Sequence, residues 1–159
     1  MKVSSGDLNR AMTGKFKRHF VTAAYLFVDM ENGILKYAGA AHTPLLLWQA
    51  KLGRATEFTE NGLMLGPFAD ATYSSISVPL EQGDRIVLFT DGVAEVENSS
   101  GEQFGVERVR DILESKHDLR PGRFVDALLY GLSNWSEKAI GSSQSDDITL
   151  LVIDFEAPA

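Results

Sequence analysis

Short apolar runs rich in β-branched and aromatic residues, separated by turns, fill the first half of the chain and predict a series of antiparallel strands. The pair Asn32-Gly33 is a strong signal for a two-stranded hairpin. A weakly amphipathic helix is predicted ahead of the strands, over residues 6–18, because apolar residues recur there at helical spacing. The predicted strands are residues 20–29, 34–40, 44–50, 73–80 and 85–91.

The apolar pattern changes to a helical period in the second half of the chain. Apolar residues fall on one face of a helix over residues 106–116 and again over 121–138. Pro121 suits the first turn of the second of these helices. A strongly apolar run over residues 147–155 predicts a last strand. Strands followed by helices and a returning strand predict an α+β fold.

Charge and composition narrow the classes of function. The chain has 15 basic and 22 acidic residues, a net charge of −7, which argues against a nucleic-acid binder because such proteins need a basic face. It has no cysteine, which excludes thiolate metal sites and cysteine nucleophiles. Its three histidines are far apart in the sequence, so carboxylate oxygens would have to hold any metal, which favours Mg²⁺ or Mn²⁺.

Neither a membrane span nor a secretory leader is predicted. The longest apolar run near the start, residues 21–28, is far shorter than the roughly 20 residues that a bilayer requires. The first twenty residues are polar and basic, without the apolar stretch of a signal peptide. These features fit a cytoplasmic protein.

Acidic residues stand at the ends of two predicted strands. Asp91 directly follows the apolar run that ends in "VLFT", and Asp146 and Asp147 directly precede "ITLLVI". If the two strands are antiparallel neighbours, Asp91 and Asp146 face one rim of the sheet. Two adjacent carboxylates repel each other unless a cation lies between them, and a divalent cation there supports metal-assisted hydrolysis. The alternative is a turn at Asp91-Gly92 and a solvated or capping Asp pair.

Five segments resemble, in order along the chain, the SpoIIE/RsbU branch of the PP2C-like (PPM) metal-dependent serine/threonine protein phosphatases. The resemblance runs from about Leu8 to Phe155 and implies an antiparallel β-sandwich flanked by helices, in an α-β-β-α order. The segments are "FVTAAYLFVD", "LKYAGAAHTPLLLW", "GLMLGPF", "LEQGDRIVLFTDGVAEVENSSGEQFG" and "SDDITLLVIDF".

The resemblance implies a biochemical activity and a partner. The activity is hydrolysis of phosphoserine or phosphothreonine by a water that Mn²⁺ or Mg²⁺ activates, without a covalent phosphoenzyme. The implied substrate is a phosphorylated anti-anti-sigma protein of the STAS type, so the chain would act in bacterial sigma-factor regulation. Sensor or regulatory domains are expected upstream in the parent protein.

The same resemblance assigns roles to individual residues. Asp91 and Asp146 match metal-binding aspartates, and catalysis would proceed through the water that the metal holds. Gly92, Asp147 and Thr149 match supporting residues, with Gly92 allowing a close turn after the acid.

His42 matches the histidine of an "NAGH-x-P" element of the family. Two roles are open for it: a catalytic base, or a residue of a structural turn. Pro44 and Gly39, which flank it, favour a shaped bend.

The chain departs from the family pattern at its beginning. The family carries an upstream "GD" acid and a "GDVSGKG"-like segment. No such segment occurs before Phe20, and the pair Gly6-Asp7 stands in the wrong context, since "GDLNRAM" matches the later helix of the family. We therefore expect residues 1–159 to form a single SpoIIE/PP2C-like domain that lacks its N-terminal metal-binding segment, with impaired activity. The alternative is a catalytically inactive interaction module that binds the same class of partner. Strands left uncovered would favour a homodimer.

Overall fold

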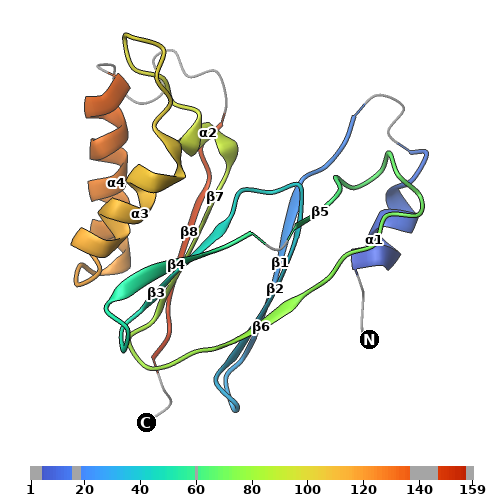
Figure 1. Cartoon of the computed structure of the whole chain (residues 1–159), viewed down its shortest axis with the longest axis horizontal. Coiled ribbons are helices and arrows are strands. Elements are labelled where there is room, and N and C mark those ends of the chain that lie inside the picture. The colour runs from blue at the N-terminus through green and yellow to red at the C-terminus, as the bar shows by residue number, and fades with distance from the viewer. Residues whose placement is uncertain (1–4, 16–18, 60, 137–146, 157–159) are drawn as a thin grey trace. The chain divides into compact units, whose positions relative to one another are not determined.

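The computed structural model describes residues 5–15, 19–59, 61–136 and 147–156, which fall into two compact units (Figure 1). The first unit comprises Met1–Pro44 and Thr59–Leu80, and the second comprises Leu45–Phe58 and Glu81–Ala157. The elements in chain order are α1 (Ser5–Met12), β1 (Ala23–Asp29), β2 (Ile34–Ala40), β3 (Leu45–Gln49), β4 (Arg54–Phe58), β5 (Asn61–Gly62), β6 (Ile76–Pro79), β7 (Arg85–Phe89), α2 (Asp91–Ala94), α3 (Gly105–Ser115), α4 (Pro121–Ser136) and β8 (Leu150–Asp154).

The sheet of the first unit is organised around β2. Strand β1 pairs with one edge of β2 in antiparallel register, from Ala23 opposite Ala40 to Asp29 opposite Ile34. The other edge of β2 pairs with β6 in antiparallel and with the short β5 in parallel orientation. The predicted hairpin between β1 and β2 is therefore confirmed.

Local hydrogen bonds explain why the hairpin turns where it does. The carboxylate of Asp29 accepts bonds from the backbone N–H and side-chain amide of Asn32, at 3.1 and 2.9 Å. These bonds lower the pKa of Asp29. Gly33 has a φ of 59°, and a Cβ there would lie 2.9 Å from the carbonyl oxygen of Leu80. Glycine meets both requirements at once.

Helix α1 is shorter than predicted. It ends at Met12, and residues 13–15 form a turn in which Gly14 has a φ of 75°. The prediction of a helix through residue 18 is wrong in its length, because the turn interrupts it, and residues 16–18 lie outside the described part of the chain. Asn9 is fully buried and joins α1 to a distant loop, donating to the carbonyl of Phe68 and accepting from the N–H of Gly66.

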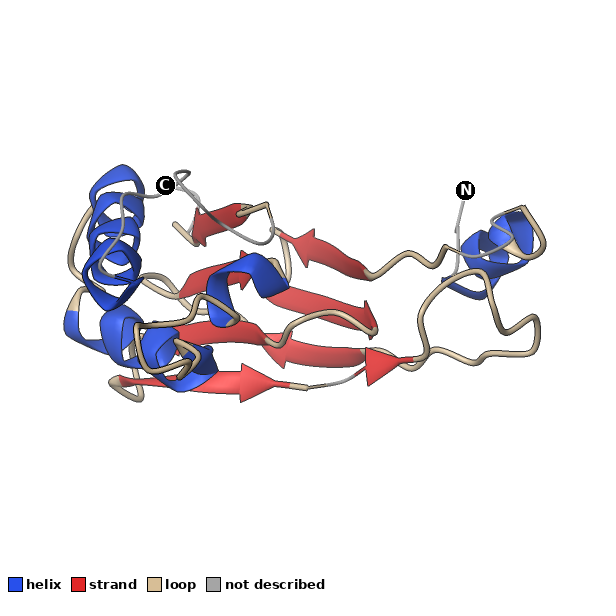
Figure 2. Ribbon diagram, turned by 90° about the horizontal axis from the view of Figure 1, so that it is seen from above, coloured by secondary structure: helices blue, strands red, loops and turns tan. Residues whose placement is uncertain are grey.

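The second unit contains an antiparallel sheet in the order β4-β3-β7-β8. Its helices α3 and α4 contact each other and pack against the sheet (Figure 2). They approach closely at Gly131, where a Cβ would lie 2.9 Å from the side chain of Ile112. Strand β4 was not predicted; its edge amide at Ala55 donates to the carboxylate of Glu114 on α3, 59 residues away.

One apolar core joins this sheet to its helices. It consists of Leu46, Trp48, Val87, Phe89, Val93, Phe104, Val109, Leu113, Phe124, Leu128 and Leu132. The predicted helices over 106–116 and 121–138 are confirmed as α3 and α4, with residues 137 and 138 outside the described part. Their apolar faces are the ones that the helical period indicated.

The predicted fold class is confirmed: the chain is α+β, with antiparallel sheets and flanking helices. Across the described residues, no helix has both the length and the apolar character that a membrane crossing needs.

Candidate functional site

Asp91 stands at the point where a buried strand ends and the chain becomes exposed. All five residues of β7 are buried, whereas Asp91 is exposed. Thr90 is extended (φ −81°, ψ 161°), and Asp91 then begins the four-residue helix α2. The N–H of Gly92 donates to the Asp91 carboxylate at 3.1 Å, and the N–H of Glu95 donates to the Asp91 carbonyl at 2.8 Å. The alternative of a simple turn is replaced by one helical turn, which fixes the backbone that carries the carboxylate.

Thr90 joins the end of β7 to the start of β8. Its hydroxyl donates to the carbonyl of Asp147 at 3.0 Å and accepts from the N–H of Thr149 at 2.9 Å. Its own N–H donates to the carbonyl of Thr149 at 3.1 Å. These two strand ends are antiparallel neighbours, which is the condition on which the predicted site depends. Thr90 was not among the predicted site residues, although a hydroxyl residue between a buried strand and an acid was the available signal.

The predicted pairing of Asp91 with Asp146 stays a prediction, because Asp146 lies outside the described residues. The next acid, Asp147, is described and its side chain is exposed. It is the carbonyl of Asp147 that Thr90 binds. Thr149 is also exposed, and its backbone makes both of the contacts with Thr90 given above. The structure therefore brings Asp91, Gly92, Asp147 and Thr149 to one end of the β7–β8 pair.

His42 belongs to the first unit, in the segment between β2 and β3. It is half-buried and follows Ala41, whose φ of 48° is the only positive value for a non-glycine residue in the described part of the chain. The N–H of Ala41 donates to the carbonyl of Gly62 at 2.9 Å. This geometry supports the structural turn at His42, and a catalytic role for its imidazole stays a prediction.

The loop that follows α2 is ordered by hydrogen bonds of its own. Glu95 and Glu97 are exposed, as a solvated loop requires. The side-chain oxygen of Asn98 accepts from the N–H groups of Ser100 and Glu102, at 2.9 and 3.0 Å. These two bonds close a local turn in the loop after α2.

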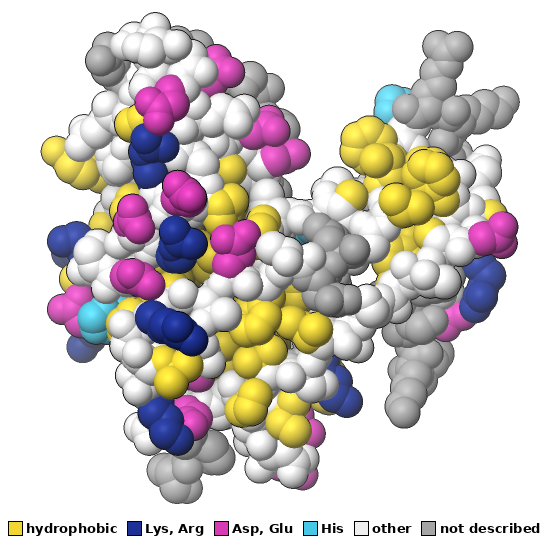
Figure 3. All heavy atoms as spheres, viewed as in Figure 1, with side chains coloured by type: hydrophobic (Ala, Val, Ile, Leu, Met, Phe, Trp, Pro, Cys, Tyr) yellow, Lys and Arg dark blue, Asp and Glu magenta, His cyan; other side chains and the backbone are white. Residues whose placement is uncertain are grey.

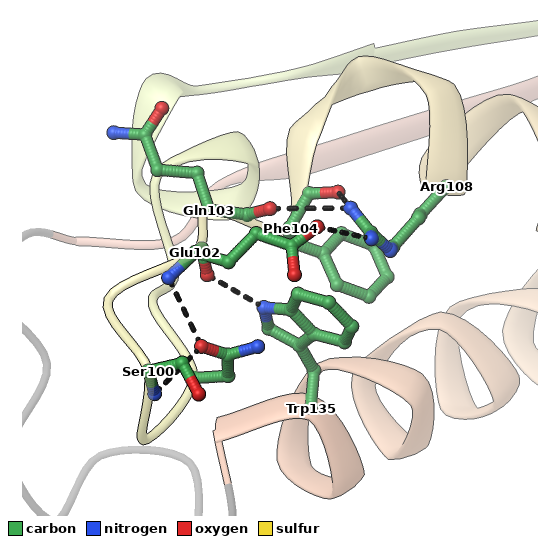
Figure 4. A network of polar contacts seen from close by, with 7 residues as sticks. Ser100, Glu102, Gln103, Phe104, Arg108 and Trp135 are labelled. Carbon is green, nitrogen blue, oxygen red and sulfur yellow. Dashed lines mark hydrogen bonds and ion pairs between the residues drawn. The ribbon is translucent and has the colours of Figure 1, made fainter.

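Three side chains tie this loop to α3 and α4 (Figure 4). The Glu102 carboxylate pairs with the guanidinium of Arg108 at 2.6 Å, and the indole N–H of Trp135 donates to the Glu102 carbonyl at 3.1 Å. The Arg108 guanidinium carbon lies 3.9 Å from the centre of the Trp135 ring, within the range of a cation–π contact. These contacts hold the segment that begins at Asp91 against both helices.

The side chains around Asp91 define which cofactor could bind. None of the ion pairs between described residues involves Asp91. Among the described residues, the Asp91 carboxylate accepts a hydrogen bond from the N–H of Gly92 alone. A donor set of carboxylate oxygens suits Mg²⁺ or Mn²⁺. Within the described ranges no group of three or more His, Asp or Glu side chains could hold a metal, and Asp146 is not among those residues.

A cavity of about 230 Å³ lies at the opposite end of β7, around Arg85 and Asp154. Arg85 is paired with Asp154 and is buried. His117, which stacks on Trp48 with ring centres 4.0 Å apart, also lines the cavity. No residue that the sequence predicted as part of the site lines it, so this cavity is separate from the candidate site.

Comparison with known proteins gives curated relatives that are much longer than this chain. It is 25% identical to Protein IcfG of Synechocystis sp. over 134 residues, which are 84% of this chain and 20% of that protein. It is 35% identical to the phosphoserine phosphatase RsbU of Bacillus subtilis over 82 residues, 52% of this chain and 24% of RsbU. It is 27% identical to the phosphoserine phosphatase RsbP of the same organism over 137 residues, 86% of this chain and 31% of RsbP. The chain thus spans between about a fifth and a third of these relatives.

Solved structures of similar fold include a PP2C domain and a phosphatase domain. The SiaA-PP2C domain of Pseudomonas aeruginosa has a TM-score of 0.80 and 26% identity, covering 95% of this chain and 59% of that one. The SpoIIE phosphatase domain of Bacillus subtilis, presoaked with Mn, has a TM-score of 0.59 and 15% identity, over 87% and 58% of the two chains. RsbX in complex with magnesium has a TM-score of 0.62 and 18% identity, over 92% and 60%. The last two show the fold alone.

The sequence profile of the family described as Stage II sporulation protein E (SpoIIE) matches residues 4–156, nearly the whole chain. The "TDG" and "DDIT" motifs, the paired strand ends that carry them and the PP2C-like fold all agree with that match. The chain belongs to the SpoIIE family of PP2C-like domains.

Proposed function

We propose that this chain is part of a PP2C-like phosphatase that removes phosphate from serine or threonine in bacterial signalling. The observation that carries the proposal is the position of Asp91. A fully buried strand delivers its carboxylate to solvent, and Thr90 fixes that strand end beside the segment that follows Asp146. Two relatives named phosphoserine phosphatases support the reaction class.

The proposed cofactor is Mn²⁺ or Mg²⁺, held by the carboxylates of Asp91 and Asp146. Carboxylate oxygens are the ligands that these ions prefer, and relatives of the same fold were solved with manganese or magnesium. When bound, such an ion lowers the pKa of a coordinated water and offsets the charge of a phosphate.

The remaining site residues act by positioning. Gly92 is buried. It allows the chain to make a close turn directly after Asp91. Thr149 and the carbonyl of Asp147 anchor the start of β8 to Thr90. A catalytic role for the imidazole of His42 stays a prediction.

The proposed substrate is a phosphorylated anti-anti-sigma protein of the STAS type. The proposal rests on the similarity to RsbU and RsbP, which are named phosphoserine phosphatases. Because those relatives are several times longer than this chain, we further propose sensor or regulatory domains in the parent protein.

A second candidate function is an interaction module without catalytic activity. The observation that favours it is the small number of ligands: the described residues gather no group of three metal-binding side chains. Two aspartates supply few of the about six oxygen ligands that Mg²⁺ or Mn²⁺ takes. We therefore expect weak metal binding and slow turnover from this chain by itself.

The experiment that separates the two functions measures Mn²⁺ binding and hydrolysis of p-nitrophenyl phosphate on the same preparations. The variant is Asp91→Asn, and the matched control is Glu97→Gln, an exposed acid on the following loop. Weak binding and slow hydrolysis, both lost in Asp91→Asn and kept in Glu97→Gln, support the phosphatase. Binding without any hydrolysis supports the interaction module. Hydrolysis that is unchanged in Asp91→Asn contradicts the proposed site.

A further inference from the structure

The position of Arg108 near the beginning of α3 is not explained by the stability of that helix. Helix α3 begins at Gly105, so Arg108 lies at the end of its first turn. The amino end of a helix carries a partial positive charge, which disfavours a cation there. The Arg108 side chain nevertheless turns back towards that end, where its guanidinium donates to the carbonyl of Phe104 at 2.9 Å. Contacts outside the helix must therefore compensate for this charge.

The guanidinium of Arg108 binds three successive residues of the loop that precedes α3 (Figure 4). Besides the Phe104 carbonyl, it binds the carbonyl of Gln103 at 3.2 Å and the carboxylate of Glu102 at 2.6 Å. The ring of Trp135 stacks on the guanidinium, and its N–H donates to the carbonyl of Glu102. A planar guanidinium presents several N–H donors in fixed directions, which an ammonium group does not. Arg108 thus fixes the last residues of this loop.

A series of backbone hydrogen bonds continues from the end of this loop to Asp91. The N–H of Phe104 donates to the carbonyl of Val96 at 2.8 Å. Val96 directly follows Glu95, whose N–H donates to the carbonyl of Asp91 at 2.8 Å. The loop that Arg108 holds is therefore bonded to the residue that directly follows the last turn of α2.

Helix α2 depends on contacts around it because it has only four residues. A single helical turn is not stable by itself. Thr90 holds the residue before its start beside β8, and Val93 is buried in the core. The bond between Phe104 and Val96 holds the chain just after its end. Because Asp91 is the first residue of this turn, the direction of its side chain depends on the supports at both ends.

We propose that Arg108 is a positioning residue for Asp91. By holding the end of the loop it fixes the end of α2 and, through α2, the direction of the Asp91 carboxylate. The residues that carry this inference all belong to the second unit. Its consequence for metal binding rests on the proposed function, in which Asp91 holds Mn²⁺ or Mg²⁺. The coupling between Arg108 and α2 does not, and it can be measured without metal.

The first test measures amide hydrogen exchange in the metal-free full chain, for the wild type and Arg108→Gln. In this variant the protection of the Phe104 and Glu95 amides should fall about tenfold, as expected for the loss of hydrogen bonds to a charged group. The amides of β3 and β7 should keep their protection.

The matched control is Arg110→Gln, which removes one positive charge from the same helix. Basic and acidic side chains are mixed on the surface over the helices of the second unit (Figure 3). Arg110 makes none of the ion pairs between described residues. Its loss should therefore leave the exchange of all these amides unchanged.

The second test measures the affinity of the folded proteins for Mn²⁺, under conditions far from unfolding. Arg108→Gln should raise the dissociation constant about tenfold, the usual effect of removing a residue that orients a metal ligand. Arg108→Lys should do the same, because an ammonium group cannot replace the planar donors. Arg110→Gln should bind Mn²⁺ as the wild type does. A merely structural role of Arg108 would lower the resistance to urea and leave the Mn²⁺ affinity of the folded protein unchanged.

Three results would overturn the proposal. Faster exchange at Phe104 with unchanged exchange at Glu95 would show that the contacts of Arg108 act only within the loop. An equal loss of protection at all amides, β7 included, would show a role in global stability alone. Wild-type Mn²⁺ affinity in Arg108→Lys would assign the effect to charge and not to position. If the wild type itself binds no Mn²⁺, the proposed metal site fails, and the exchange at Glu95 still decides whether Arg108 holds α2.

Discussion

The two ends of β7 carry charged residues in opposite surroundings. Arg85, at the start, has a side chain that is 4% exposed; its guanidinium binds Asp154 at 2.5 and 2.9 Å and the carbonyl of Leu119 at 2.5 Å. It also lies over the ring of Phe124, 5.2 Å from the centre. Asp91, just past the other end, is exposed, and within the described part of the chain its carboxylate accepts a bond only from the adjacent Gly92.

This contrast separates a charge that stabilises the fold from one that is free to bind a ligand. A buried charge is tolerated only where partners compensate for lost hydration, so removing it costs stability. An exposed carboxylate held by backbone contacts contributes little to folding and keeps its oxygens available. The two residues should therefore respond in opposite ways when stability and metal binding are measured separately.

The largest expected effect on stability is at Arg85. Arg85→Met should lower the free energy of unfolding by about 3 kcal/mol, because Asp154 and the Leu119 carbonyl lose their partner in a largely buried place. Urea unfolding measures this loss. The double variant Arg85→Met with Asp154→Leu should recover part of this loss. If Arg85→Met by itself is as stable as the wild type, the Arg85 charge does not stabilise the fold.

Thr90 should show an intermediate effect on stability and a larger one at the site. Thr90→Val keeps the shape of the side chain but removes both hydroxyl bonds, which we expect to cost about 1–2 kcal/mol. It should also weaken Mn²⁺ binding, because the start of β8 loses its anchor. Thr90→Ser, which retains the hydroxyl, should restore both properties. If Thr90→Val and Thr90→Ser lose stability and Mn²⁺ binding equally, the hydroxyl is not the cause of the loss.

The contacts between the loop and the helices should contribute less. Trp135→Phe removes the N–H bond to Glu102 and weakens the stacking with Arg108, at a cost of about 0.5–1 kcal/mol. Thermal unfolding with and without Mn²⁺ can separate stability from site geometry. The exposed Tyr130 on α4 offers a control substitution, Tyr130→Phe, which should change neither.

Local patterns predicted the elements whose structure depends on neighbouring residues. Asn32-Gly33 predicted the β1–β2 hairpin because the turn chemistry is local. The helical period predicted α3 and α4. The predicted site at the strand ends required β7 and β8 to be antiparallel neighbours, and they are.

The features that sequence analysis missed depend on contacts between distant residues. Strand β4 has its edge amide at Ala55 bound by Glu114, and Asn9 is buried because it bonds to Gly66 and Phe68. The hydroxyl bonds of Thr90 likewise join residues 57 and 59 positions apart. No local pattern carries such information. The position of Asp146, which lies outside the described residues, stays a prediction.

The smallest expected change in stability, at Asp91, provides the most direct test of the account. Without metal, Asp91→Asn should unfold within about 0.5 kcal/mol of the wild type, because the side chain is exposed. Mn²⁺ at ten times its dissociation constant should stabilise the wild type by about 1.4 kcal/mol and leave Asp91→Asn unchanged. If Mn²⁺ stabilises both proteins equally, or if Asp91→Asn unfolds as readily as Arg85→Met, then Asp91 is not a metal ligand held by the end of β7.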